Sequence, residues 1–334
     1  MNYRLSQKKL HNKTKSAAIL LGCLSMLMML CFTGCATGKK SQGPQFEYGN
    51  PYYKHIKDLP ENQAAAMAYK DAPVPDLPEA TSDEYEALGD AMLKKEKLHL
   101  AFLQYNRALE KAPDSLRVSY KIGLTYLMGN KLDEASNWFN KVIQSDPTYA
   151  EAWEGLGQIY FFKKEYKLAE SHFMKAIALK NDMWRSHNYL GYIYDIQQHH
   201  TLAIRQYIEA LAIQPQNGSL YNNLGVAYSL EGRYSEAVEA FQAAIKMNYT
   251  LPKVYNNLGL TLANLERFDE ALTAFKKGVG EAQAYNNLGC VYLKFENFDQ
   301  AIACFEKAIA LDPQFYVKAN QNLQRAKMAK AAGS

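Results

Sequence analysis

The stretch GSLYNNLGVAYSLEGRYSEAVEAFQAAIKMNYTL, residues 218–251, is one copy of a unit that recurs along most of this 334-residue chain. Its glycine at position 8 of the unit belongs to a series with a spacing of 34 residues, followed by one last interval of 30. The series is Gly89, Gly123, Gly157, Gly191, Gly225, Gly259 and Gly289. In all seven units position 20 is alanine and position 24 is tyrosine or phenylalanine. The chain is therefore predicted to be a stack of one repeated unit.

The spacing within each unit predicts two helices. Apolar residues at positions 4, 7, 8 and 11 share one face of a first helix, and those at 20, 24 and 27 share one face of a second. Proline ends the second helix in four units, because it lacks the N–H that another turn needs. These prolines are Pro113, Pro147, Pro215 and Pro313. Each helix pair alone leaves an apolar side exposed, so neighbouring units must stabilise one another by stacking.

This pattern closely resembles the tetratricopeptide repeat. The resemblance implies an all-α fold, a right-handed superhelix (α-solenoid) of about seven helix-turn-helix repeats across residues 82–315. The expected units are 82–115, 116–149, 150–183, 184–217, 218–251, 252–281 and 282–315. The sixth unit is short near Gly278 and Gly280. We interpret this as a tolerated deletion of about one helical turn, with a glycine hinge as the alternative.

Residues 316–334 are expected to form a cap helix and tail that cover the open end of the stack. In this helix Val317, Leu323 and Met328 are predicted to face the last unit. The polar residues between them are predicted to face water.

The first 34 residues have the layout of a secretory signal peptide. Five basic residues precede an apolar run from Ala17 to Phe32, and no acidic residue occurs before Cys35. The run ends in Phe32-Thr33-Gly34-Cys35, which resembles the bacterial lipobox, and this resemblance implies lipidation of Cys35. An uncleaved membrane anchor is the alternative, although 16 apolar residues are fewer than the roughly 20 that span a bilayer. Ala36, where inner-membrane lipoproteins carry aspartate, resembles an outer-membrane address.

Residues 35–81 would then be a lipidated N-terminus and a tether, since 36–81 hold six of the eleven prolines. Without the signal, the chain has 33 basic and 34 acidic residues. The near-neutral charge gives no reason to expect nucleic-acid binding. Cys290 and Cys304 remain outside the signal and the lipidation site, and helix positions 9 and 23 do not favour a disulfide between them.

No sequence motif predicts catalysis, a cofactor or a metal site. The chain contains no H-E-x-x-H, P-loop, G-x-S-x-G or paired C-x-x-C pattern. Gly155-Leu156-Gly157 falls inside a predicted helix rather than after a strand. His199 and His200 are predicted to be solvated residues of a turn. An enzyme is therefore not expected.

Since catalysis is not expected, protein binding is the predicted function, and the repeat resemblance suggests where it occurs. In tetratricopeptide arrays positions 2, 5, 6, 9, 12 and 13 line a concave groove. The motif Tyr-Asn-Asn-Leu-Gly places amides at positions 5 and 6, and the arrangement resembles the asparagine ladder of O-linked N-acetylglucosamine transferase. A primary amide both donates and accepts hydrogen bonds, so such a row suits an extended peptide backbone. The predicted groove residues are Asn188, Asn222, Asn223, Asn256, Asn257, Asn286, Asn287 and Lys253.

The other known groove chemistry, the carboxylate clamp of chaperone-binding repeats, matches only at Asn223 and Lys253. The shortened sixth unit and its YNNLG motifs look most like tetratricopeptide lipoproteins of tight-adherence (Flp-type) pilus and related secretion systems. We therefore expect a periplasm-facing, membrane-anchored scaffold that binds protein or peptide clients during envelope assembly. The alternatives are an adaptor that recruits peptidoglycan hydrolases or proteases to the outer membrane, and an outer-membrane biogenesis component.

Overall fold

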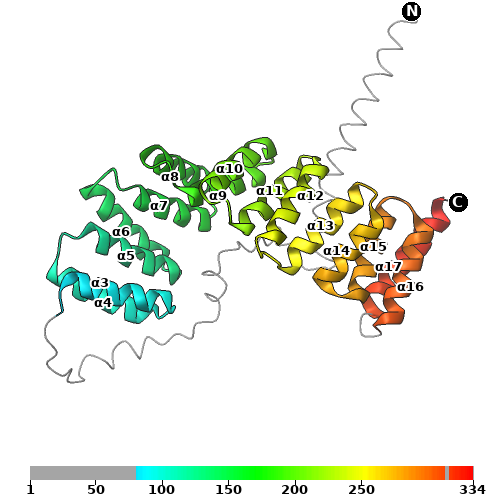
Figure 1. Ribbon diagram of the computed structural model, residues 1–334, viewed down its shortest axis with the longest axis horizontal. Coiled ribbons are helices and arrows are strands. Elements are labelled where there is room, and N and C mark those ends of the chain that lie inside the picture. Colours follow the sequence, from blue (N-terminus) through cyan, green and yellow to red (C-terminus); the bar gives the residue numbers. More distant parts are fainter. Residues whose placement is uncertain (1–79, 313–315, 334) are drawn as a thin grey trace, which may run out of the picture. The chain divides into compact units, whose positions relative to one another are not determined.

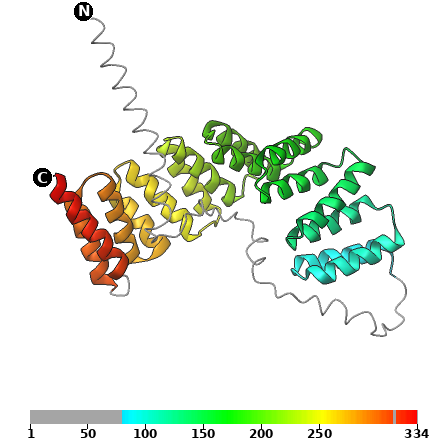
Figure 2. The ribbon, with the colours of Figure 1, turned by 180° about the vertical axis from the view of Figure 1, so that it is seen from behind.

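A computed structural model describes residues 80–312 and 316–333 of the chain. Within these ranges the chain forms fifteen α-helices and no β-strand. The helices are α3 (Ser82–Lys94), α4 (Leu98–Lys111), α5 (Leu116–Met128), α6 (Leu132–Ser145), α7 (Ala150–Phe162), α8 (Tyr166–Leu179), α9 (Trp184–Ile196), α10 (His200–Ile213), α11 (Gly218–Leu230), α12 (Tyr234–Lys246), α13 (Pro252–Asn264), α14 (Phe268–Val279), α15 (Glu281–Lys294), α16 (Phe298–Leu311) and α17 (Tyr316–Gly333). Each helix lies beside the next one in chain order (Figure 1, Figure 2). The all-α solenoid expected from the sequence is confirmed.

The two helices of each pair are joined by three residues, and the middle one has a positive φ. This left-handed residue reverses the chain, and it occupies position 15 of every unit. The seven residues are Glu96, Asn130, Lys164, Gln198, Gly232, Glu266 and Glu296. Only one is glycine, so the other six hold a backbone conformation that side chains disfavour.

The glycine at position 8 allows the aromatic ring at position 24 to lie against its own first helix. A Cβ on Gly191 would come within 2.6 Å of the Tyr207 ring, and a Cβ on Gly225 within 2.8 Å of Phe241. The ring is fully buried in every unit, as in Phe173 at 0% exposed. The repeated glycine and the repeated aromatic are therefore two halves of one packing contact.

Neighbouring units pack through a second recurring contact. Positions 20, 24 and 27 of one unit contact positions 3, 7 and 10 of the next. Between the second and third units, Ala135, Phe139 and Val142 of α6 pack with Ala152, Leu156 and Ile159 of α7. This contact buries the side of each first helix that its own pair leaves uncovered.

The sixth and seventh units are linked by a single residue. Gly280 follows α14 directly, precedes α15, and has φ of 82°. A Cβ on Gly278 would lie 2.9 Å from the Pro252 carbonyl oxygen and 3.0 Å from Tyr255. One glycine thus supplies the turn, and the other permits close approach of α14 to α13.

Helix α17 closes the C-terminal end of the described stack. At the C-terminal end α17 covers α16 through Ala319, Leu323 and Ala326, which are at most 7% exposed. The prediction that Val317 and Met328 face the last unit is wrong, since they are 67% and 70% exposed. The buried side of α17 is instead lined by small residues that fit closely against α16. No helix in either described range combines the length and apolar character of a membrane span.

Candidate functional site: an asparagine row across the repeats

The predicted groove asparagines form hydrogen bonds between successive repeats. Asn223 Nδ2 of α11 donates to Asn188 Oδ1 of α9 at 3.0 Å. Asn287 Nδ2 of α15 donates to Asn256 Oδ1 of α13, also at 3.0 Å. In both pairs position 6 of one unit donates to position 5 of the unit before it. The stacking that buries the apolar faces therefore also aligns these amides in a row.

The row continues into α17. Asn322 Nδ2 donates to Asn286 Oδ1 at 2.9 Å and lies 3.5 Å from Cys290 Sγ. Asn322 is 2% exposed. Sequence reasoning missed this residue because it lies in the cap helix, where the unit numbering no longer applies.

The regular pairing is interrupted between α11 and α13. By the pattern of the other units, Asn257 would donate to Asn222. Instead Asn222 Nδ2 donates to the adjacent Asn223 Oδ1 at 3.3 Å, and the buried Asn222 Oδ1 has no hydrogen-bond partner among the described residues. Asn257 is half-buried, and its side-chain amide makes no hydrogen bond in the same part of the chain. An unused acceptor and an unused amide thus lie on adjacent repeats.

Two of the predicted groove residues lie deeper than expected. Asn222 and Asn286 are 4% and 2% exposed, which makes them more buried than Asn188 and Asn256 at the same position of their units. Asn188, Asn223, Asn256, Asn257 and Asn287 are half-buried. The Lys253 ammonium nitrogen lies 5.8 Å from the centroid of the Tyr249 ring. The open part of the row is therefore made by the three asparagines at position 6 together with Asn188 and Asn256 at position 5.

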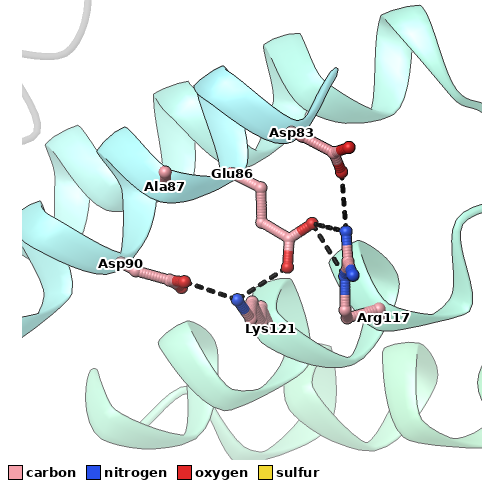
Figure 3. Close-up of a pocket in the computed structure, with 6 residues that line it drawn as sticks. All are labelled: Asp83, Glu86, Ala87, Asp90, Arg117 and Lys121. Atoms are coloured by element: carbon pink, nitrogen blue, oxygen red, sulfur yellow. Dashed lines mark hydrogen bonds and ion pairs between the residues drawn. The ribbon is translucent and has the colours of Figure 1, made fainter. Parts of the chain in front are cut away.

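A charged cluster on the first two units was not predicted. Glu86 is 5% exposed and pairs with Arg117 and Lys121, with N–O distances of 2.7 Å to each (Figure 3). Asp83 lies 2.8 Å from Arg117, and Asp90 lies 2.6 Å from Lys121. These residues occupy positions 2, 5, 6 and 9, so the same unit numbering applied to residues 82–149 would have found them. Every charge in the cluster has an opposite partner.

The histidines differ from the expectation of solvated turn residues. His199 is exposed, but His200 begins α10 and its side chain is 17% exposed. His200 Nδ1 lies 3.0 Å from Asp195 Oδ1, and the Tyr207 hydroxyl donates to Asp195 Oδ2 at 3.1 Å. Burial raises the pKa of Asp195, while its hydrogen bond to His200 acts in the opposite direction. This cluster ties the end of α9 to α10.

The cysteines and possible metal ligands offer no second site. Cys290 and Cys304 are not joined by a disulfide, and burial raises the pKa of Cys304 to about 11. Residues 80–312 and 316–333 hold no group of three His, Cys, Asp or Glu side chains suited to a metal. Cys35 lies outside the described residues.

Comparison with known proteins identifies the repeat. Tetratricopeptide repeat models match residues 150–183, 219–248, 252–281 and 282–315, and a further TPR repeat model matches 128–164. A search among curated proteins found no match.

Several solved structures are similar. The crystal structure of the APC/C hetero-tetramer Cut9-Hcn1 is 23% identical with a TM-score of 0.52, and the match covers 75% of this chain and 49% of that one. This chain thus spans about half the length of that relative. The MamA protein is 28% identical with a TM-score of 0.41, covering 51% of this chain and 92% of that one. Pseudomonas aeruginosa pilF is 22% identical with a TM-score of 0.49, covering 65% and 98%.

The matches to repeat models and the helix packing of the structure both identify the same helix-turn-helix repeat. Repeats of this kind form scaffolds for protein–protein interaction, generally without catalysis, and bind protein or peptide partners. The chain carries tetratricopeptide repeats folded as an α-helical solenoid.

Proposed function

We propose that this scaffold binds an extended segment of a client protein along the asparagine row. The observation that supports the proposal is the interrupted pairing between Asn222 and Asn257. The half-buried Asn257 amide, left unused by this interruption, would pair with a backbone N–H and a backbone carbonyl of the client. Because these are backbone contacts, they hold the client in an extended form without selecting its side chains.

The proposal includes a cellular setting. We infer from the sequence that Cys35 is lipidated and that the repeats face the periplasm from the outer membrane. There the scaffold would assist assembly of an envelope machine such as a tight-adherence pilus or a related secretion system. Finding genes for a secretin and a pilus ATPase next to the gene of this chain would support this setting, whereas finding genes for cell-wall enzymes there would contradict it.

Asn257→Ala tests the binding site. The side chain makes no hydrogen bond in the described structure, so its loss should leave the fold intact. Each lost bond to a client should cost about 0.5–1.5 kcal/mol, a two- to tenfold loss of affinity. The assay is fluorescence anisotropy with peptides selected by the wild-type chain from a synthetic nonapeptide array.

The matched control is Gln242→Ala, a polar side chain exposed on α12. Circular dichroism must show both variants folded. Equal peptide affinities for the two variants would exclude Asn257 as part of the binding surface.

The anchor is tested separately with Cys35→Ser. Labelled fatty acid should enter the wild-type chain and be absent from the variant, because thioether-linked acylation requires the cysteine sulfur. Label retained in the variant would contradict lipidation at this residue.

A further inference from the structure

A buried carboxylate in the third repeat has no cationic partner. Glu154 occupies position 5 of its unit on α7 and is 6% exposed. Its Oε2 accepts a hydrogen bond from the Ser186 hydroxyl of α9 at 2.8 Å. Among the described residues Glu154 forms no ion pair, although an isolated buried carboxylate is costly.

The first repeat supplies an internal comparison. Glu86 stands at the same position, is 5% exposed, and has both oxygens paired with cations of the following unit. Those cations, Arg117 and Lys121, occupy positions 2 and 6. The same stacking geometry can therefore deliver positive groups to a buried position-5 carboxylate.

The residues that follow Glu154 do not repeat this arrangement. At position 2, Arg185 places its guanidinium 4.6 Å from the centroid of the Trp184 ring instead of on the carboxylate. At position 6, lysine is replaced by Tyr189, whose ring stacks on Phe173 at 5.0 Å. The Glu86 carboxylate is paired with two cations of the chain, whereas the Glu154 carboxylate has no ion-pair partner among the described residues.

The surrounding groups do not cancel this charge. Burial raises the pKa of Glu154, whereas hydrogen bonding from Ser186 and the more distant charge of Arg185 lower it. Nearby Glu151 is already paired with Lys180 at 2.9 Å. The pKa of Tyr120 is raised mainly by burial, with a smaller contribution from the Glu154 charge.

We propose that Glu154 receives a cationic side chain, lysine or arginine, from the client held by the repeats. The incoming ammonium or guanidinium N–H groups donate to the carboxylate, as Lys121 and Arg117 do at Glu86. This inference rests on the proposed peptide-binding function and adds selectivity to it. The asparagine row holds the backbone of the client, and Glu154 selects one of its side chains.

The first test compares the stabilities of Glu154→Gln and Glu86→Gln in the full chain. Glu154→Gln should raise the midpoint of urea denaturation at pH 7, because it removes an uncompensated buried charge. Glu86→Gln should lower the midpoint, because it breaks both ion pairs of a buried carboxylate. A lower midpoint for Glu154→Gln would show that the carboxylate is already compensated, for instance by Arg185, and would overturn the proposal.

The pH dependence has a defined sign. A carboxyl whose pKa is raised by folding destabilises the fold increasingly as pH rises from its unfolded value toward its folded value. The advantage of Glu154→Gln should therefore be larger at pH 7 than at pH 4.5. An advantage that does not change with pH would contradict the assignment to the carboxylate charge.

The second test measures selectivity with a synthetic array of nonapeptides of varied sequence. Wild-type chain and Glu86→Gln should both favour peptides with lysine or arginine at one position, and Glu154→Gln should lose that preference. For the best peptide, Glu154→Gln should bind about tenfold more weakly, and replacing the peptide lysine by norleucine should abolish the difference.

The outcomes separate this inference from the proposed function. Peptide binding without a basic preference, or a preference retained in Glu154→Gln, overturns the role of Glu154 but leaves the asparagine row standing. Absence of binding to any peptide overturns both.

Discussion

The leucine at position 7 of the unit is buried in the middle of the stack and partly exposed in the first described unit. Substitutions at these two places therefore measure how much the contact between repeats stabilises the fold. Leu88 and Leu190 both occupy position 7 of their units. Leu190 is 2% exposed because the preceding unit covers it, whereas Leu88 is 45% exposed because no described unit precedes α3. Replacing each by alanine removes the same atoms from different environments.

The expected magnitudes follow from burial. Leucine-to-alanine removes the equivalent of about three methylene groups, worth about 2.4 kcal/mol when fully buried. At Leu190 an added cavity term brings the loss to about 3 kcal/mol. At Leu88 roughly half of the transfer term applies and solvent fills the space, so the loss is about 1 kcal/mol. Helix propensity cancels in the comparison, since both residues lie within helices.

The assay is urea denaturation followed by circular dichroism, combined with hydrogen exchange. Because a repeat array need not unfold in one step, exchange identifies where each change acts. Leu190→Ala should speed exchange in α8, α9 and α10, and Leu88→Ala only in α3 and α4. A loss at Leu88 as large as that at Leu190 would refute the assignment of α3 as an uncovered end.

Two further predictions concern the turns and the cysteines. Lys164 is exposed and has φ of 63°, so Lys164→Gly should stabilise the chain by about 0.5–1 kcal/mol in thermal denaturation, and a lower melting temperature would contradict strain at this turn. Because burial raises the pKa of Cys304 to about 11, iodoacetamide should modify it slowly at pH 8 and faster as pH rises toward 11. Mass spectrometry of the Cys304 peptide measures the rate, and rapid labelling at pH 8 would contradict the burial.

Much of the fold could be predicted because its signals are local and repeated. The 34-residue interval between Gly191 and Gly225 is the length of one helix pair. The aromatic ring that fills the space beside each of these glycines lies 16 residues later in the sequence. Seven copies in register leave few alternative arrangements. The cap helix shows the limit, since α17 has no repeated partner and mixes small, polar and apolar residues. Its buried side was decided by the fit of Ala319 and Ala326 against α16.

The candidate site could be predicted only in part. Unit numbering placed the asparagines at positions 5 and 6, but did not show that Asn223 would bond to Asn188 while Asn257 would be left without a partner. Those contacts depend on the rotation and translation between units, and small differences between interfaces change which amide oxygen lies within reach.

The sequence by itself determined the repeat, the helix pairs and the identity of the polar residues on one side of them. The tertiary structure alone decided the state of those polar residues. Glu86 and Glu154 hold the same position and are almost equally buried, yet Glu86 pairs with two cations and Glu154 pairs with none in the part of the chain that the structure describes. Their partners come from the following unit, more than 30 residues along the chain, so only the stacking of the repeats brings a charge to the first carboxylate and leaves the second unpaired.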